Sequence, residues 1–214
     1  MRESEFNKWT EVFLAKAKAL YPSTDPSHDY LHILRVVKTA LELAQAEGAD
    51  INIVLPAAYF HDFVTIPKDD PRRAQASQLS AEAATEYLTS VDYPEKYLEA
   101  IKHAIAAHSF SANIKPETLE AKVVQDADRL DGLGAIGIAR CFSTCTLMQR
   151  PYYCAEDFYA QNRELNDKEF AVDHFPIKLF KIAETMNSEA ARIEAKKRVL
   201  FMKEYLKQLS TEIE

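Results

Sequence analysis

Apolar positions recur with a helical period along most of the chain, and this pattern predicts an all-α protein. No segment alternates between apolar and polar residues as a half-buried strand does, and no Asn-Gly hairpin turn is present. The clearest stripe lies in the second predicted helix and consists of Ile33, Val36, Val37, Ala40 and Ala44. We expect one helical bundle, a single domain spanning residues 1–214.

Turn and capping residues divide this pattern into separate helices. Ser27 or Asp29 can cap the second helix, Gly48 can end it, and Asp70 before Pro71 marks the start of the fourth. The expected helices cover residues 5–20, about 29–47, a short segment after Asp50, about 70–90, about 94–107, one or two within 117–148, and a C-terminal pair beginning near Pro176 and near Ser188. Residues 150–173 have the weakest period, which favours a surface connection; a lid over a site is the alternative.

Composition narrows the class of protein. The chain has 214 residues, of which 47% are apolar and 28% charged, as in ordinary globular domains. A formal charge of −7 without a basic stripe argues against a nucleic-acid partner. No run approaches the roughly 18 apolar residues of a membrane span, and the N-terminus does not resemble a signal peptide. We therefore expect a cytoplasmic protein without a membrane partner; the sequence does not indicate its oligomeric state.

Histidine and aspartate residues stand at positions where apolar residues would be expected. His32 lies at the edge of the stripe of the second helix, and His61 and Asp62 end the apolar run "AAYFHDF". Three further carboxylates, Asp126, Asp128 and Asp131, lie among apolar residues in "VVQDADRLDGL". Like charges in a semi-apolar setting repel one another and resist desolvation, so they call for a nearby cation. Histidine nitrogens and carboxylate oxygens together suit a divalent transition metal.

Each of these features has an ordinary explanation when taken alone. A single histidine on an apolar helix face is usually a hydrogen-bonded core residue, and a His-Asp dipeptide is common. The segment "DADRLD" by itself would be read as a solvated or salt-bridged helix face. The order of the motifs in one helical chain is what favours a metal site.

In this order the motifs resemble those of the HD-domain metal-dependent phosphohydrolases, a superfamily of helical proteins. "HDYLHILRV", "AAYFHDF" and "DADRLDGLGAIGIAR" are similar to its first, defining and last motifs, and "PKDDPRRAQAS" and "HAIAAHSFS" resemble segments of a bacterial branch of small single-domain members. The resemblance covers mainly residues 25–150, and residues 174–212 more loosely. It implies His32, His61, Asp62 and Asp128 as ligands of one or two divalent ions, which could be Mn, Mg, Fe, Co or Ni.

The resemblance also implies an activity, the hydrolysis of a phosphate ester or anhydride by metal-activated water. Similarity to the small bacterial branch suggests a nucleotide substrate, and a nucleoside triphosphate pyrophosphohydrolase is one possibility. A regulatory helical domain that binds a nucleotide or metal without turnover is the alternative. A purely structural helical protein, which would bind no metal, is a third hypothesis.

Other residues near these motifs are candidates for contact with substrate. His103 and His108 are five apart, so on a straight helix they point about 140° apart and reach one site only if the helix ends or bends. We expect His103, His108 or Asp131 to donate a proton or to orient the water. The candidate phosphate-binding residues are Arg35, Lys68, Arg72, Arg73 and Ser77. A solvated charged turn is the alternative for Lys68, Arg72 and Arg73, because Asp69 and Asp70 offset their charge.

The glycine-rich stretch "GLGAIG", residues 132–137, matches the dinucleotide-binding pattern GxGxxG. That fingerprint requires a preceding strand within a βαβ unit, and the preceding segment here is predicted to be helical. We expect these glycines to bend the chain or to allow close packing. The three cysteines, Cys141, Cys145 and Cys154, are expected to be small buried thiols, because their number and spacing fit neither a disulfide framework nor a zinc site.

Overall fold

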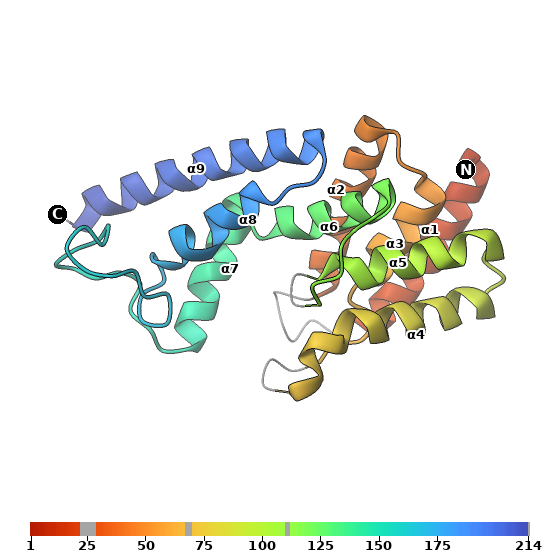
Figure 1. The fold of residues 1–214 in the computed structure, drawn as a ribbon, viewed down its shortest axis with the longest axis horizontal. Helices are drawn as coiled ribbons and strands as arrows, with labels where there is room; N and C mark the ends of the chain where they lie inside the picture. The colour runs from red at the N-terminus through yellow and green to blue at the C-terminus, as the bar shows by residue number, and fades with distance from the viewer. Residues whose placement is uncertain (22–28, 67–69, 110–111, 214) are drawn as a thin grey trace. The chain divides into compact units, whose positions relative to one another are not determined.

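The structure is a computed structural model that describes residues 1–21, 29–66, 70–109 and 112–213. Every regular element within these residues is helical, which confirms the expected all-α class. The elements are α1 (Glu3–Leu20), α2 (Tyr30–Glu47), α3 (Ile51–Phe60), η1 (Pro71–Gln75), α4 (Ala76–Ser90), η2 (Glu95–Tyr97), α5 (Leu98–His108), α6 (Leu119–Asp131), α7 (Gly134–Leu147), η3 (Phe175–Leu179), α8 (Phe180–Glu184) and α9 (Glu189–Ile213) (Figure 1).

Local chemistry explains where several of these helices begin and end. The carboxylate of Asp29 accepts a hydrogen bond from the amide of His32 at 2.8 Å and caps α2. Gly48 ends the same helix in the left-handed region, with φ 78°, which glycine adopts without steric cost. Ser27, the other predicted cap, lies outside the described residues. The fourth helix differs from the expectation, because Asp70 caps the 3₁₀ turn η1 and the α-helix begins only at Ala76.

The described residues group into two compact units, Met1–Asp128 and Arg129–Glu214. The single domain expected over residues 1–214 stays a prediction. No helix within the described part of the chain is both long enough and apolar enough to cross a membrane.

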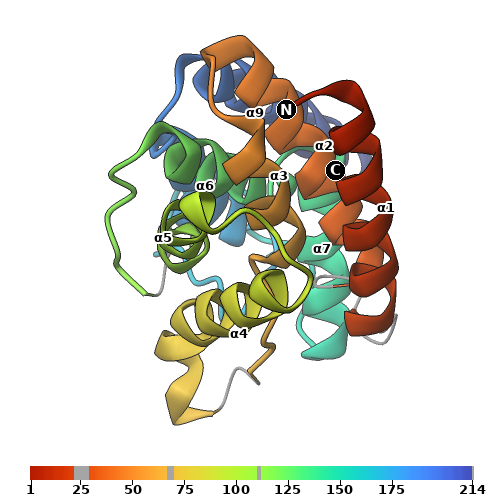
Figure 2. The same cartoon turned by 90° about the vertical axis from the view of Figure 1, so that its right-hand side faces the viewer.

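Helix α3 is the centre of the first unit, where it contacts α1, α2, α4 and α5 (Figure 2). All of its residues from 54 to 60 are buried, as expected for a helix that is apolar on every side. The ring of Phe60 meets that of Phe13 at 5.2 Å and that of Tyr87 at 5.3 Å between centroids. Full burial of one such ring stabilises the fold by about 1.5–3 kcal/mol. This packing fixes the position of the residues that follow α3.

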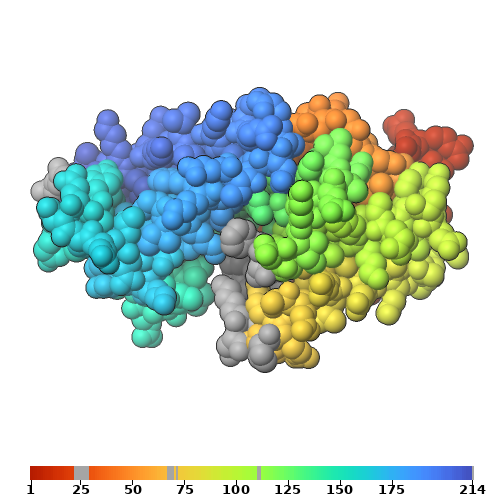
Figure 3. All heavy atoms as spheres, viewed as in Figure 1, coloured from red at the N-terminus to blue at the C-terminus, as the bar shows by residue number. Residues whose placement is uncertain are grey.

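Helices α4 and α5 pack against each other on one side of this unit. The buried face of α4 consists mainly of small residues, which allow two helices to approach closely: Ser77, Ser80, Ala81, Ala84 and Leu88. The outer sides of α4 and α5, yellow and light green in Figure 3, form part of the surface of the molecule.

In the second unit, α7 packs against α9, and the glycine-rich stretch joins α6 to α7. Gly134 has φ +70°, and a Cβ atom on Gly137 would clash with the carbonyl oxygen of Gly132. These two constraints account for glycine at the first residue of α7 and in its first turn. The element before this stretch is the helix α6, as expected, and not the strand that a dinucleotide-binding fingerprint requires. The cysteines are free thiols, of which Cys145 is buried and the other two are half-buried.

Residues 150–173 contain turns and little regular structure, and a buried ion pair closes the segment. The guanidinium of Arg163 donates to both carboxylate oxygens of Asp173, at 2.5 and 2.8 Å, and the amide of Asn166 donates to Asp173 at 2.7 Å. Although burial alone would raise the pKa of Asp173, these hydrogen bonds lower it below its ordinary value. A lid function for this segment stays a prediction.

We expect Asp173→Ala to lower the free energy of unfolding by about 2 kcal/mol, because Arg163 would lose its carboxylate partner. The side chain of Arg163 is partly solvated, which keeps this loss below that of a fully buried ion pair. A carboxylate with a lowered pKa stabilises the fold above its unfolded pKa, so the difference from the wild type should disappear as the pH falls below about 4. Urea unfolding at several pH values measures both effects. The control is Glu169→Ala, an exposed carboxylate of the same segment, with a change within about 0.5 kcal/mol.

Candidate metal centre

His61 and Asp62 follow directly on the last residue of α3. His61 keeps a helical backbone, with φ −58° and ψ −36°, before the chain turns. The side chain of His61 is 0% exposed and that of Asp62 is 26% exposed. The buried helix therefore carries the imidazole into the interior of the unit and leaves the carboxylate at its edge.

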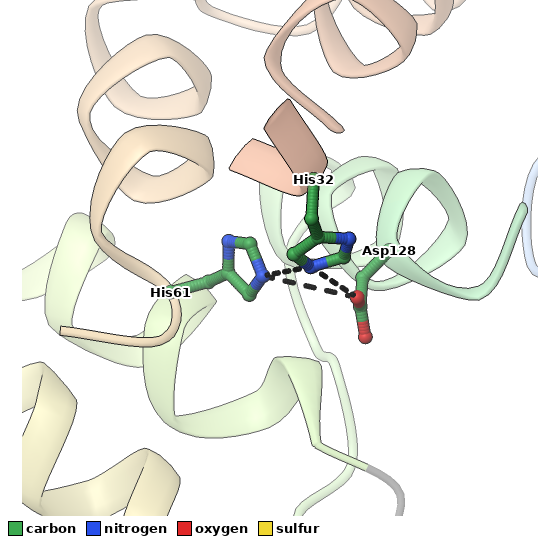
Figure 4. A group of neighbouring side chains, drawn as sticks. All are labelled: His32, His61 and Asp128. Carbon is green, nitrogen blue, oxygen red and sulfur yellow. Dashed lines mark hydrogen bonds and ion pairs between the residues drawn. The ribbon is translucent and has the colours of Figure 1, made fainter. Parts of the chain in front are cut away.

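Three side chains from separate elements meet at this point (Figure 4). The Nε2 atoms of His32 on α2 and His61 lie 3.3 Å apart. The Oδ1 atom of Asp128 on α6 lies 3.5 Å from Nε2 of His32 and 3.8 Å from Nε2 of His61. Both imidazoles are buried, and the carboxylate of Asp128 is 29% exposed. The three predicted ligands thus present their donor atoms to one another.

The protonation state of His61 follows from its other ring nitrogen. Nδ1 lies 2.9 Å from the carbonyl oxygen of Ala58, which can only accept, so Nδ1 carries the proton. Burial lowers the pKa of His61, which favours the neutral ring with a lone pair on Nε2. That lone pair faces the acceptor atoms of Asp62 and Asp128. Nε2 of His32 lies 3.3 Å from Nε2 of His61 and 3.5 Å from Oδ1 of Asp128, so a single proton on this nitrogen could not be donated to both at once.

A second group shares His61 and adds Asp62 and His108. Oδ2 of Asp62 lies 3.7 Å from Nε2 of His61, and Oδ1 lies 3.5 Å from Nε2 of His108. Nδ1 of His108 donates to the carbonyl oxygen of Ile105 at 2.7 Å, which turns Nε2 toward Asp62. Burial would lower the pKa of His108, but the hydrogen bond and the charge of Asp62 raise it. His108 is therefore placed either to bind a cation or to hold a proton.

The donor set fits a divalent metal. Atoms about 2.1 Å from one cation lie roughly 3.0–3.4 Å apart in octahedral or tetrahedral arrangements. The distances of 3.3 to 3.8 Å within the first group are close to this spacing. The buried acceptors need positive charge, and the fixed tautomer of His61 presents its free nitrogen to them. His32, His61 and Asp128 would hold such an ion with Asp62 beside them, and the second group offers ligands for another.

The structure does not bring His103 or Asp131 into either group of candidate ligands. Nε2 of His103 accepts a hydrogen bond from the amide of Glu117 at 3.0 Å. The buried carboxylate of Asp131, in the second unit, pairs with Arg140 at 2.9 Å. Catalytic roles for these two residues stay predictions.

The predicted phosphate-binding residues differ in their surroundings. Arg72 is exposed and forms a salt bridge with Asp70 at 2.8 Å, whereas Arg73 donates to the neutral carbonyl oxygen of Ile66 at 2.6 Å. Ser77 is buried at the start of α4. Arg35 is half-buried on α2, three residues after His32, and Lys68 lies outside the described residues.

Sequence reasoning missed three residues near the site. Thr65 and Ser109 line a cleft beside Asp62 and His108, but both lie outside regular helices, where periodicity gives no signal. Tyr21 was read only as the end of a helix, yet its hydroxyl is buried and donates to the carbonyl oxygen of Tyr59 at 3.0 Å. Burial, with the charge of Asp62, raises the pKa of Tyr21 well above its ordinary value.

Comparison with known proteins agrees with this geometry. The model of the HD domain family matches residues 29–133, which include all four predicted ligands. The uncharacterized protein YpgQ of Bacillus subtilis (strain 168) is 33% identical over 210 residues, which are 96% of this chain and 94% of YpgQ.

Solved structures of two bacterial proteins are similar to this chain over nearly its whole length. The crystal structure of Bacillus subtilis YpgQ in complex with ADP is similar with a TM-score of 0.75 and 30% identity, and the match covers 96% of this chain and 95% of that one. An HD-superfamily hydrolase from Bacillus thuringiensis has a TM-score of 0.74 and 30% identity, with 96% and 97% covered.

We expect His61→Ala and Asp128→Ala each to lower affinity for Mn²⁺ by at least about tenfold, since each removes a ligand atom from the first group. Elemental analysis of the purified variants and calorimetric titration with the metal measure this loss. The control is His174→Ala, because His174 pairs with Asp167 and belongs to neither group. Unchanged metal content in both ligand variants would mean that the metal assignment is wrong.

Proposed function

The chain belongs to the HD-domain family, as its motifs predicted, and on this premise we propose that it is a metal-dependent phosphohydrolase acting on a nucleotide. It has the fold of HD-superfamily hydrolases and a His/Asp group able to bind a divalent metal. The bond that it hydrolyses would be a phosphate ester or anhydride, and the substrate a nucleotide.

The observation that carries this proposal is the shared position of His61 in two groups of candidate ligands. Buried imidazole nitrogens and partly exposed carboxylates lie next to a cleft that also contains a cationic side chain, Arg73. A phosphate ester needs positive charge on its oxygens and a polar site for the attacking water. Both are available within one region of the first unit.

A divalent cation bound by these ligands would lower the pKa of a water molecule and neutralise charge on the phosphoryl oxygens. The protein supplies the remaining functions. His32, His61 and Asp128 fix the position of attack, and Asp62 orients His108 through its Oδ1 atom, 3.5 Å from Nε2. Placed next to the carboxylate of Asp62, His108 can hold a proton at Nε2 and donate it to the leaving oxygen. Arg73 can stabilise negative charge on a phosphate.

Two considerations support a nucleotide as the substrate. The YpgQ structure, which is similar over nearly the whole chain, contains ADP. The motifs also resemble the small bacterial branch of the family, and this resemblance suggests a nucleotide substrate, with cleavage of a nucleoside triphosphate to release diphosphate as one form of the reaction. Manganese is the first metal to test, because it accepts both imidazole and carboxylate ligands.

We expect the purified protein with added Mn²⁺ to hydrolyse at least one nucleoside triphosphate, and His61→Ala to lower kcat by at least about a thousandfold because a metal ligand is lost. A panel of nucleotides with chromatographic product analysis measures the rate and identifies the bond that breaks. His174→Ala should behave as the wild type.

Release of nucleoside monophosphate and diphosphate would support the pyrophosphohydrolase form of the proposal, whereas release of orthophosphate would contradict it. Nucleotide binding without turnover for any member of the panel would favour the regulatory binding domain. Absence of both metal and nucleotide binding would leave only a structural role.

A further inference from the structure

A cleft beside the second ligand group has features of its own. It has an empty volume of about 360 Å³, including the solvent at its mouth. Asp62 and His108 line it together with residues 64–66, and Arg73 and Ser77 line it from η1 and α4. The cleft lies wholly within the first unit.

Adjacent arginines at the entry to α4 differ in their charge balance. Arg72 donates to Asp70 through Nε at 3.1 Å and Nη2 at 2.8 Å, so a carboxylate already neutralises it. Arg73 donates only through Nη1, to the carbonyl oxygen of Ile66, and has no carboxylate partner among the described residues. A guanidinium has five N–H donors, so within the described residues Arg73 lines the cleft with a charge that no carboxylate pairs and with several unused donors.

Ser77 gives a second, independent indication of a ligand. The residue is 2% exposed, and its hydroxyl is one of two buried side-chain polar atoms in the described residues without a hydrogen-bond partner. A buried hydroxyl without a partner has lost its hydrogen bonds to water, and a ligand that accepts from it would restore one. The staggered positions of a serine hydroxyl differ by rotation about one bond, so it can turn toward a group in the cleft. The other such atom, the hydroxyl of Thr10, belongs to α1, and Thr10 does not line the cleft.

We propose that this cleft is a subsite for a phosphate group remote from the attacked phosphorus, bound by the guanidinium of Arg73 and the hydroxyl of Ser77. Its position beside Asp62 and His108 makes it part of the substrate path, so the inference rests on the proposed phosphohydrolase function. It narrows the substrate class to nucleotides with two or more phosphates. A monophosphate ester would occupy the point of attack and leave the cleft without a charged group.

The test uses inorganic diphosphate as the probe, titrated calorimetrically into the Mn²⁺-loaded protein. We expect Ser77→Ala to weaken binding about tenfold, as for one lost hydrogen bond to a charged group, and Arg73→Gln to weaken it at least as much. Arg73→Lys should recover part of the affinity, because it keeps the charge without the guanidinium geometry. The matched controls are Arg72→Gln, the neutralised neighbour, and Thr10→Val, the other unpaired hydroxyl; both should bind diphosphate as the wild type does.

Kinetics and stability separate this role from a structural one. The KM for a nucleoside triphosphate should rise about tenfold in Ser77→Ala, while the KM for p-nitrophenyl phosphate, which has one phosphate, stays unchanged. The free energy of unfolding of Ser77→Ala should equal or exceed that of the wild type, since the hydroxyl has no protein partner. Wild-type diphosphate affinity in both Ser77→Ala and Arg73→Gln, or loss of stability in Ser77→Ala, overturns the subsite.

The subsite and the proposed function can fail separately. If nucleotide hydrolysis is unchanged by substitution of Ser77 and Arg73, the subsite proposal is contradicted and the phosphohydrolase proposal stands. If diphosphate binding depends on both residues but the protein hydrolyses no nucleotide, the subsite is supported and the phosphohydrolase proposal is contradicted.

Discussion

Hydrogen-bond acceptors that face one another inside the protein are the constraint on which the rest of the first unit depends. The nitrogens of His32 and His61 meet 3.3 Å apart with both rings fully buried, and carboxylate oxygens complete the cluster. Acceptors in this arrangement destabilise the fold unless a cation or proton lies between them. Helices α2, α3 and α6 each bring one donor atom to this point, so their packing must hold several polar groups where apolar ones would be more stable.

The apolar character of α3 follows from that constraint. The energetic cost of burying His61 must be offset nearby, and the residues from 54 to 60 are buried against four other helices. Phe60 immediately precedes the ligand pair, and its ring contacts with Phe13 and Tyr87 leave the end of α3 little freedom. Sub-ångström placement of metal ligands requires such support, because a loosely held imidazole loses affinity for its ion. The motif "AAYFHDF" thus combines the anchor and the ligands in seven residues.

The features that could be predicted from the sequence are those that depend on neighbouring residues. Asp29, Gly48 and Asp50 set the ends of α2 and the start of α3 through local hydrogen bonds and backbone preference, and all three act as expected. Convergence of His32, His61 and Asp128 was predictable only because the order of motifs resembles a known family. Neither helical period nor spacing can state which faces of three separate helices will meet.

The choice between neighbouring candidates was beyond the sequence, because it depends on partners distant along the chain. His103 and His108 share one helix, but α5 ends at His108, which meets Asp62, while His103 accepts from the amide of Glu117. Arg72 and Arg73 are equivalent in the sequence, yet the 3₁₀ turn before α4 directs one to Asp70 and the other to the carbonyl of Ile66. Charge that is already paired contributes little to binding an anion, and unpaired charge at the edge of a cleft contributes much more. Selectivity for a phosphate chain would therefore arise from backbone geometry, which decides which of two identical side chains remains free to bind.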